Sequence, residues 1–396
     1  MRVLFVTHNV PRFDGDVAGS FVLRLAAALQ TAGARVEIIA PGTNQATIDT
    51  LDGVVIHRVP YASRERMTLA YTGTMVEQVK RSWSGRLALL GLLRALRRAA
   101  HVHLARAEQA GDPYDVIHAH WWFPAGLALW HGLPSRTSGR ATHVLKRVLT
   151  MHGSDVRLAQ TMAPARRLMA SVLAEYDART SVSQWLANTA HSIAPALPVQ
   201  VLPMPVDNAR FVAPTGACTR QDVLFVGRLN AQKGVADLVR ALAHPALAHA
   251  ALDVVGDGPD HDALHALASA SGVSHRIRWH GTVTPDQLVP LYQRAAAVAM
   301  PSHNEGLGLV AVEAQMCGAP VVAYNSGGLP DVVRPSEGGT LVSPGDVEGL
   351  AAALGALVND PAEAVRRGAL ARSSVAARFS PASVAASYLA LYRDVQ

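Results

Sequence analysis

Two glutamates, Glu305 and Glu313, lie in the stretch SHNEGLGLVAVEAQMCGAPVV (302–322), where apolar residues and glycines predominate. Burying a carboxylate without a partner costs on the order of several kcal/mol, so such a group neutralises or acquires donors. We therefore expect both acids to be paired or to bind a ligand. The alternative is a surface acid next to a buried structural ion pair.

The same stretch also offers backbone donors. Gly306 and Gly308 allow the backbone to approach a ligand closely, and a helix that starts near Leu307 has free N–H groups in its first turn. At ~3.6 residues per turn, that helix carries Glu313 less than two turns onward. Both acids can then face one ligand at different depths.

A second loop carries two cations. GRLNAQKG follows the strand-like DVLFV and places Arg228 and Lys233 between glycines. A guanidinium and an ammonium group at a strand end can bind a diphosphate together, although a solvated loop with incidental charges is the alternative. In VVGDGPD, Gly256 and Gly258 fit a tight turn at least as well as a nucleotide site, because a full G-x-G-x-x-G is missing.

Three histidines follow the pattern of strand ends. YDVIHAHW and HVLKRVLTMHGSD each read as a strand that ends in histidines and small or polar residues. Ligands bind at the carboxyl ends of strands in a doubly wound sheet, which places His118, His120 and His152 near the expected crevice. For each one, a hydrogen-bonded core histidine is the alternative.

The elements that must position these residues alternate between strand and helix. RVLFVTH, GSFVLRLAAALQTAG and RVEIIAP form one strand–helix–strand unit, and the same plan starts again at DVLFVG after a proline-rich stretch. A chain of 396 residues also exceeds the usual size of a single core. We predict an N-terminal domain over 1–200, a C-terminal domain over 215–378, and a helix in 379–396 that could pack back on the first domain.

Composition and charge indicate the cellular compartment of the protein. Cys218 and Cys317 show no metal-ligand or disulfide spacing, which suggests a reducing compartment. No signal peptide is recognisable, and the run Leu87–Leu93 is too short to span a membrane. Residues 1–213 carry 23 Lys+Arg against 14 Asp+Glu, whereas residues 214–396 carry 13 against 16. We expect a cytoplasmic protein, either soluble or peripheral on the inner face of the membrane.

The positive charge is concentrated in the basic region 80–106. Between Glu77 and Glu108 there are seven Lys or Arg residues and no acid, around an amphipathic stretch. A basic amphipathic helix can bind an anionic membrane, although an ordinary helix packed on the sheet is the alternative. We expect no nucleic-acid binding, because the region has no recognised binding motif.

These segments together resemble the retaining glycosyltransferases of the GT-B fold, in the large bacterial family 4-like group with an E-x7-E motif. The pieces that carry the resemblance are GRLNAQKG, VVGDGP, the segment from MPSHNEGLG to GGLPDVV, and the terminal YLALYRDV. Glu305 and Glu313 have the E-x7-E spacing. The resemblance implies an α/β architecture of two Rossmann-like doubly wound domains that face a central crevice.

The resemblance also implies roles for the donor-side residues. Arg228 and Lys233 would hold the donor diphosphate, Glu313 would accept hydrogen bonds from the ribose hydroxyls, and Glu305 would contact the transferred sugar. The backbone amides of Gly306, Leu307 and Gly308 would lie by the sugar and the phosphates.

On the first domain, His152 in TMHGSD would lie by the donor sugar and the leaving phosphate, and His120 in HAHWWFPAG would contact the acceptor. Relatives have a Gly-Gly pair after the first strand, where amides touch donor phosphate or acceptor. This chain has Gly15 and Gly19 separated in FDGDVAGSF. Between the domains it has the stiffer sequence PMPVD in place of P-N-G-V-D.

The reaction implied is transfer of a hexosyl group from a UDP- or GDP-linked sugar to a carbohydrate, lipid-linked or small-metabolite hydroxyl, as in cell-envelope polysaccharide biosynthesis. The implied mechanism is front-face, with retention and without a cofactor or metal, because Arg228 and Lys233 would stabilise the charge that develops on the leaving phosphates. A sugar-nucleotide 2-epimerase of the same fold is the main alternative, and a non-catalytic partner is a third.

Overall fold

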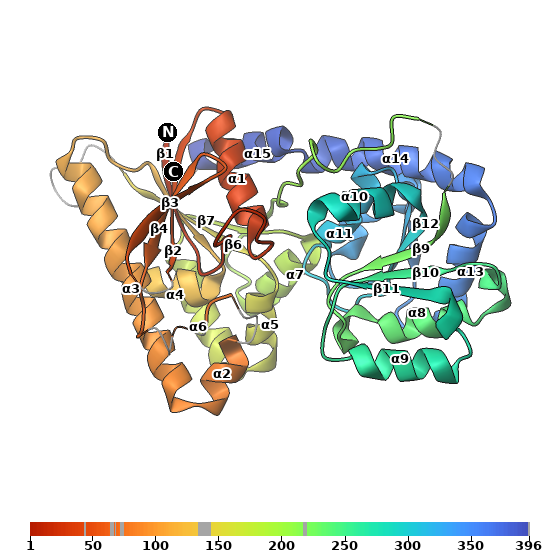
Figure 1. Cartoon of the computed structure of the whole chain (residues 1–396). Helices are drawn as coiled ribbons and strands as arrows, with labels where there is room; N and C mark the ends of the chain where they lie inside the picture. The colour runs from red at the N-terminus through yellow and green to blue at the C-terminus, as the bar shows by residue number, and fades with distance from the viewer. Residues whose placement is uncertain are drawn as a thin grey trace. The chain divides into compact units, whose positions relative to one another are not determined.

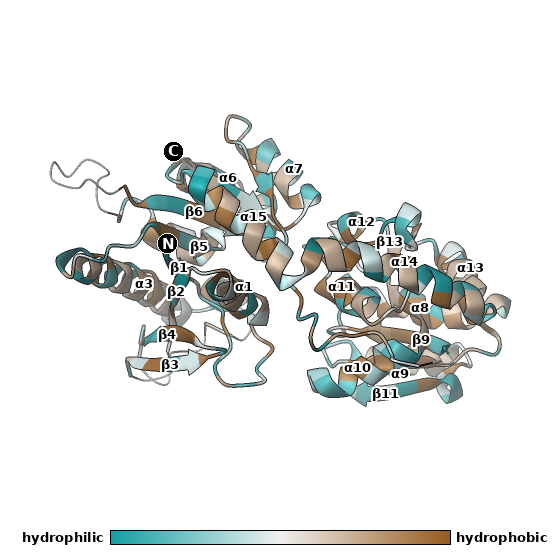
Figure 2. Cartoon of the chain, turned by 90° about the horizontal axis from the view of Figure 1, so that it is seen from above, coloured by the Kyte–Doolittle hydropathy of each residue, from teal (hydrophilic) through white to brown (hydrophobic). Residues whose placement is uncertain are grey.

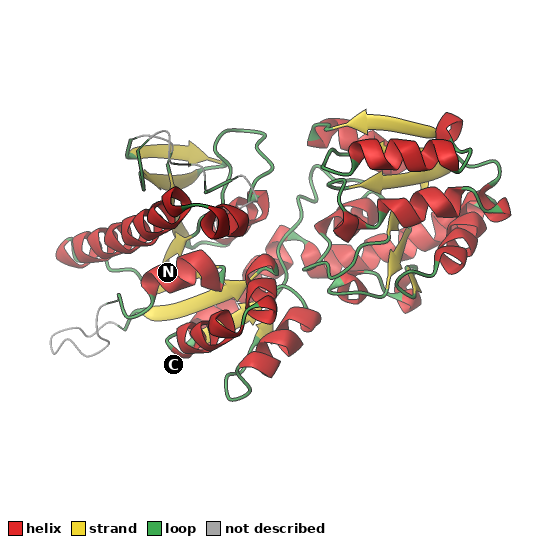
Figure 3. Ribbon diagram, turned by 90° about the horizontal axis from the view of Figure 1, so that it is seen from below, coloured by secondary structure: helices red, strands yellow, loops and turns green. Residues whose placement is uncertain are grey.

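The computed structural model describes residues 1–42, 45–63, 67, 69–71, 75–133, 144–216 and 220–394. The chain forms two compact units (Figure 1). Unit 1 comprises Met1–Pro205 and Pro381–Gln396, and unit 2 comprises Val206–Ser380. Each unit has a sheet of mainly parallel strands with helices on both faces (Figure 3), which confirms the predicted α/β class with two Rossmann-like units. Cys218 lies outside the described residues.

Unit 1 contains an eight-stranded sheet in the order β3-β4-β2-β1-β5-β6-β7-β8. Its central strands are apolar and buried, as expected for a parallel sheet covered on both faces. The strands are β1 (Arg2–Val6), β2 (Arg35–Pro41), β3 (Thr47–Leu51), β4 (Val54–Val59), β5 (Val116–His120), β6 (Lys146–Met151), β7 (Ala178–Ser181) and β8 (Gln200–Val201).

The helices of unit 1 cover this sheet, and the C-terminal helix is one of them. α15 packs against α1 and contributes the fully buried Tyr388 and Tyr392 to the unit. The helices are α1 (Ser20–Thr31), α2 (Met75–Arg81), α3 (Trp83–Gln109), α4 (Leu127–Leu129), α5 (Ser154–Thr161), α6 (Ala163–Ala174), α7 (Gln184–Ile193) and α15 (Pro381–Asp394).

Strands β3 and β4 form an antiparallel hairpin that was not predicted from the sequence. Its turn is Asp52-Gly53, and both residues have positive φ, at 49° and 74°. An Asp-Gly pair between two strands favours this two-residue turn, so the sequence did contain a signal for the hairpin.

Unit 2 contains a six-stranded, fully parallel sheet in the order β11-β10-β9-β12-β13-β14. This is the strand order of the Rossmann fold. Strands β10 and β11 are added on one side of β9, and β12, β13 and β14 are added on the other side. The strands are β9 (Gln221–Val226), β10 (Leu252–Val255), β11 (Ile277–Gly281), β12 (Ala295–Met300), β13 (Val321–Tyr324) and β14 (Thr340–Val342). The apolar run of β9 is visible as brown ribbon in Figure 2.

The helices of unit 2 begin at sequence signals. α10 starts with a capping box in which Thr284 and Gln287 each satisfy a backbone amide, and α13 starts with Asp346, whose side chain accepts from the amide of Gly349. The helices are α8 (Val235–Leu242), α9 (His261–Ala270), α10 (Pro285–Arg294), α11 (Leu309–Met316), α12 (Leu329–Val332), α13 (Val347–Val358) and α14 (Pro361–Phe379). No helix in the described part of the chain is both long and apolar enough to cross a membrane.

Candidate active site

In unit 2, the residues that the family resemblance assigns to donor binding lie on the loops that follow β9 and β12, except Glu313, which lies in α11. These two strands are neighbours and lead to helices on opposite sides, which makes their carboxyl ends the topological switch point of the sheet. The β9 loop carries Arg228 and Lys233, and the β12 loop carries Glu305. The fold therefore brings together two motifs that are about 70 residues apart in the sequence.

Glycines permit the close approach of these loops. A Cβ on Gly234 would lie 2.0 Å from the carbonyl oxygen of Pro301, and one on Gly256 would lie 1.9 Å from that of Gly227. Both glycines also have positive φ, at 67° and 127°. The turn reading of VVGDGPD agrees with this packing, because Gly256 and Gly258 press against the β9 loop.

Lys233 and Glu305 are bonded to each other. The Lys233 Nζ lies 2.6 Å from Glu305 Oε2, and the two side chains are 20% and 18% exposed. Asn230 fixes the base of the lysine loop, because its Oδ1 accepts from the Lys233 amide at 3.2 Å. The structure thus presents a partly buried ammonium–carboxylate pair at the switch point.

The Arg228 side chain is exposed and forms no ion pair or hydrogen bond with any residue that the structure describes, although the backbone carbonyl accepts from the Asn230 amide at 3.0 Å. It follows Gly227 directly at the end of β9. Its guanidinium is therefore available to a ligand at the carboxyl end of the strand, while Lys233 has a protein partner.

The amides after Glu305 are open to a ligand. In the described part of the chain, the backbone N–H groups of residues 306–310 have no acceptor, and Gly308, with φ of 91°, leads into α11. The helix begins at Leu309, two residues later than the sequence suggested. A run of free amides at a helix N-terminus is a binding site for an anion.

Glu313 lies within α11 and contacts α10. Its Oε2 accepts a hydrogen bond from the hydroxyl of Tyr292 at 3.2 Å. Burial, followed by the nearby charge of Glu313, raises the pKa of Tyr292 well above its usual value, so the hydroxyl keeps its proton and remains a donor. The same burial and charge raise the pKa of the Cys317 thiol to about 12. Glu313 and Glu305 therefore have separate protein partners, Tyr292 for Glu313 and Lys233 for Glu305.

In unit 1, His120 and His152 form one histidine pair at the ends of β5 and β6. The His120 Nδ1 and His152 Nε2 atoms are 3.1 Å apart. His120 is fully buried and its Nε2 has no partner among the described residues. His152 is partly exposed, and its ring centroid lies 4.2 Å from that of Trp121 with the two rings tilted. Burial lowers the pKa of both rings, that of His120 to about 3, so both are neutral near pH 7.

Asp155 holds the loop that carries His152. Its Oδ1 accepts from the amides of His152, Gly153 and Val156 at 2.9–3.2 Å, and its Oδ2 accepts from the Trp122 amide at 3.0 Å. This buried carboxylate therefore joins the segments that follow β5 and β6. Its backbone bonds fix the position of the His152 ring.

His118 takes the alternative role of a core histidine. It is fully buried, with Nδ1 2.7 Å from the Tyr392 hydroxyl and Nε2 2.7 Å from Thr150 Oγ1. The expectation that it lies by an open crevice is wrong for this residue, because the C-terminal helix α15 covers it. Its ring still stacks on that of His120, with centroids 4.3 Å apart.

The loop after β1 contains both glycines named from the sequence. Gly15 is exposed with φ of 86°, and Gly19 is buried with φ of 65° at the start of α1. A Cβ on Gly19 would lie 2.4 Å from the Asn9 carbonyl oxygen, so this position requires glycine. His8 in the same loop packs its ring 4.6 Å from Trp121, beside the histidine pair.

Comparison with known proteins agrees with this geometry. The family described as "Glycosyltransferase Family 4" matches residues 18–210, and "Glycosyl transferases group 1" matches residues 214–374. The D-inositol 3-phosphate glycosyltransferase of Xylanimonas cellulosilytica is 31% identical, over 96% of this chain and 92% of that protein. This chain belongs to the group 1 and family 4 glycosyltransferases. The resemblance inferred from the E-x7-E segment is thereby confirmed.

This glycosyltransferase is also similar to other members over its whole length. It is 28% identical to the glycogen synthase of Mycobacterium tuberculosis, over 99% of this chain and 94% of that protein. Its fold is similar to that of sucrose-phosphate synthase from Thermosynechococcus elongatus, with a TM-score of 0.78 and 23% identity over 99% and 98% of the two chains. The HepE protein of Anabaena, solved in complex with UDP-glucose, is similar with a TM-score of 0.69 and 19% identity over 99% of this chain and 100% of that chain. These structures show the GT-B fold.

Several residues at the site of this glycosyltransferase were not identified from the sequence. Tyr292 and Asn230 are ordinary residues of a helix and a loop, and only the packing of α10 on α11 brings Tyr292 to Glu313. Asp155 could have been predicted from the sequence. It lies in TMHGSD at the start of a helix, where a carboxylate can accept hydrogen bonds from backbone amides.

Proposed function

We propose that this enzyme is a retaining hexosyltransferase that uses a UDP- or GDP-linked sugar and a hydroxyl acceptor on a glycan, a glycolipid or a small metabolite. The observation that carries the proposal is the Lys233–Glu305 pair beside the open amides of residues 306–310. A cation, a carboxylate and an anion-binding helix start are what a diphosphate joined to a sugar requires. All three stand at the switch point of unit 2.

The donor diphosphate binds to the cations and the amides. Arg228, exposed and without a described partner, supplies a fork for two phosphate oxygens, and Lys233 supplies a point charge. The amides of Gly306, Leu307 and Gly308 complete the cradle at the start of α11. Negative charge grows on the phosphates as the sugar leaves, so these fixed donors stabilise the transition state more than the bound substrate.

The two glutamates bind the two ends of the donor. Glu313, held by the Tyr292 hydroxyl, accepts hydrogen bonds from the ribose. Glu305 binds hydroxyls of the transferred sugar and keeps Lys233 oriented through the 2.6 Å contact. A carboxylate accepts two hydroxyl donors readily, which suits both roles.

Unit 1 contributes His152 and the residues that hold it. His152 is partly exposed and neutral, so its ring can donate one hydrogen bond to a sugar hydroxyl or a leaving phosphate oxygen. His120 supports the acceptor side through its 3.1 Å contact with His152, since its own ring is buried. Gly15 and Gly19 shape the loop after β1 for the same ligands.

Retention follows from a front-face reaction. The bond from the anomeric carbon to the diphosphate breaks, the acceptor oxygen bonds to the same face, and the departing diphosphate takes the acceptor proton. Arg228 and Lys233 balance the charge that a metal would otherwise balance, so donor chemistry proceeds without one.

The first test is a thermal-shift panel with UDP, GDP, ADP and their sugar conjugates, without added metal, because a ligand that binds only the folded state raises stability. A shift with one nucleotide fixes the base. The anomeric configuration of the product, read by NMR, then tests retention, and an inverted product would refute it. Conversion of the donor in the absence of any acceptor would instead indicate the 2-epimerase alternative.

We also propose that the basic region 80–106 binds anionic membranes. Within α3, Ala88, Leu92 and Leu96 face the unit's core, as the alternative reading requires, but Trp83, Leu87 and Leu90 are 76%, 56% and 47% exposed. Arg86 lies 4.9 Å from the Trp83 ring. Exposed apolar side chains among cations favour an interface with anionic lipid.

The membrane proposal is tested by co-sedimentation with phosphatidylcholine vesicles, with and without phosphatidylglycerol. Binding should require the anionic lipid and fall strongly in Trp83→Ser. The control is Ile48→Ser, which removes another exposed apolar side chain, on β3. Binding that does not depend on anionic lipid would contradict the proposal.

A further inference from the structure

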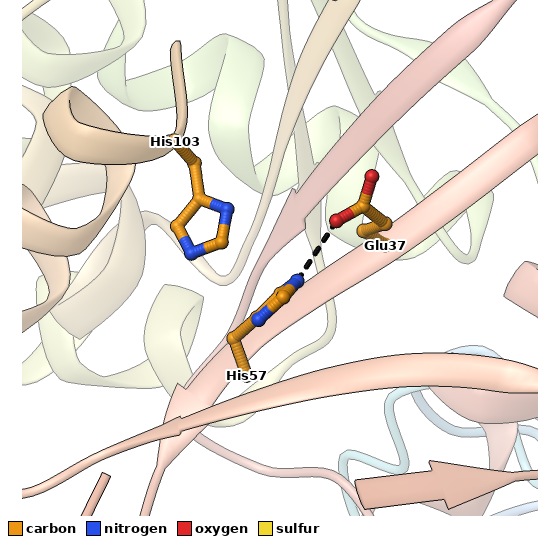
Figure 4. A group of neighbouring side chains, drawn as sticks. All are labelled: Glu37, His57 and His103. Carbon is orange, nitrogen blue, oxygen red and sulfur yellow. Dashed lines mark hydrogen bonds and ion pairs between the residues drawn. The ribbon is translucent and has the colours of Figure 1, made fainter. Parts of the chain in front are cut away.

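A second group of chemistry-bearing side chains lies in unit 1, away from the strand ends. Glu37 of β2, His57 of β4 and His103 of α3 each offer one ligand atom, and these atoms all lie within 4.8 Å of one another (Figure 4). Glu37 and His57 stand on neighbouring parallel strands, and α3 packs over the same face. Neither the transfer reaction nor the donor site uses these residues.

We propose that Glu37, His57 and His103 bind one divalent transition-metal ion, zinc by preference, with water as the fourth ligand. Two imidazoles and one carboxylate are a common ligand set for Zn²⁺, whose bonds to nitrogen and oxygen are roughly 2.0–2.2 Å long. Ligand atoms around such an ion are ~3.4 Å apart, so the side chains need only small rotations. The ion would join α3 to strands β2 and β4 of the sheet.

The contacts of His103 leave its ring nitrogens available to a metal. Among the residues that the structure describes, none forms a hydrogen bond or ion pair with this partly buried ring, which lies 4.1 Å from that of His57. An imidazole binds a metal through a ring nitrogen that carries no proton, so a ring whose nitrogens have no protein partner can turn one of them toward the ion.

The carboxylate is oriented by a second set of contacts. Glu37 Oε2 lies 2.8 Å from His57 Nε2, while Oε1 accepts from Arg2 Nη2 at 2.7 Å. Partners of this kind hold a metal-binding carboxylate in place. The Arg2 charge also offsets that of Glu37, so the imidazoles carry most of the affinity.

The experiment uses the full-length protein after treatment with a chelator and buffer exchange. Zn²⁺ is titrated against a chromophoric indicator, and Co²⁺ is added separately to read the coordination from the visible spectrum. We expect the protein to bind one equivalent of Zn²⁺ tightly, to give the visible spectrum of tetrahedral Co²⁺, and to melt at a higher temperature with Zn²⁺. In His57→Gln and His103→Gln the affinity should fall by more than the ~10-fold typical of losing an outer partner.

The matched control is His101→Gln, which removes an exposed histidine of the same helix and should leave binding unchanged. His261 and His265 are one turn apart on α9, with rings 4.4 Å apart, and could bind the same ions weakly. The titration is therefore repeated in His265→Ala. The proposal is overturned if wild type and His103→Gln bind alike, if the equivalent disappears in His265→Ala, or if wild type gives no tetrahedral spectrum. The Co²⁺ spectrum is measured on the wild-type protein, so this test does not depend on whether a variant folds.

Discussion

Lys233 Nζ lies 2.6 Å from Glu305 Oε2, and both side chains are about four-fifths buried. The pair connects the β9 loop to the β12 loop across the switch point of unit 2. In the proposed function the two charges have different roles, because the Lys233 ammonium group binds the phosphates and the Glu305 carboxylate binds the sugar. A donor that binds here must compete with Glu305 for Lys233, which separates the expected effects of changing each residue.

Lys233→Ala should lower kcat/KM for the nucleotide sugar by at least about 30-fold, which corresponds to ~2 kcal/mol, the scale of one charged hydrogen bond. Glu305→Gln should lower turnover similarly but keep or tighten nucleotide binding, since Lys233 loses its competitor. Steady-state kinetics and nucleotide titration measure both. Arg240→Ala is the control, because Arg240 is an exposed cation of α8 that pairs only locally, with Asp237. Near wild-type kinetics in Lys233→Ala would remove the assignment.

Tyr292→Phe should raise KM for the donor by several-fold with a smaller change in kcat. The substitution removes the 3.2 Å bond that orients Glu313, and a neutral hydrogen bond contributes about 1 kcal/mol. Glu313→Ala should cost at least ~2 kcal/mol in kcat/KM, since the ribose contact itself is lost. Tyr324→Phe is the matched control, because the buried Tyr324 donates to Asp237 at 3.0 Å instead. Equal effects in both Tyr variants would indicate general destabilisation.

The sequence contained most of the information about the proposed donor site. Glu305, Glu313, Arg228 and Lys233 stand in short segments whose glycines and charges are interpretable locally, and alternating elements predict a parallel sheet that brings strand ends together. Tyr292 could not be predicted in this way, because its contact with Glu313 depends on how α10 packs on α11. His118 illustrates the opposite error: its place near a strand end suggested ligand binding, but Tyr392, 274 residues later, covers it.

The Glu37–His57–His103 group also could not be predicted from the sequence, because its members meet only in the folded structure. Its members are 20 and 46 residues apart and belong to no spacing motif. Only the pairing of β2 with β4 and the packing of α3 bring them within 4.8 Å. Local patterns specify elements and tight loops, whereas side chains on separate elements meet through register and packing.

Sugar transfer should continue at its full rate in excess EDTA, assayed well below the melting temperature. In the proposed function Arg228 and Lys233 stabilise the leaving diphosphate, so removing metal ions should not slow that step. Any metal at Glu37, His57 and His103 would affect the stability of unit 1 instead, and would appear as a lower melting temperature. Activity that EDTA abolishes and added Mg²⁺ or Mn²⁺ restores would refute metal-independent transfer.

Unit 1 should lose stability as the pH falls below about 6.5. Burial lowers the pKa of His8 to about 4 and that of His120 to about 3, and it also lowers the pKa of His152. The unfolded chain therefore binds more protons than the folded chain between these values and the ordinary value of 6.5. Stability is complete above 6.5 and falls by ~1.4 kcal/mol per pH unit for each such histidine as the pH decreases toward the folded value.

Urea unfolding between pH 7.5 and 5.0 measures this slope, and tryptophan fluorescence reports mainly on unit 1, because Trp279 alone among the six tryptophans lies in unit 2. His8→Phe should reduce the pH dependence of the free energy of unfolding by the contribution of one histidine. A phenyl ring can keep the contact with Trp121 and cannot be protonated. His101→Gln, at an exposed position, should leave the slope unchanged. A stability that is independent of pH across this window would mean that these rings are not buried in their neutral form.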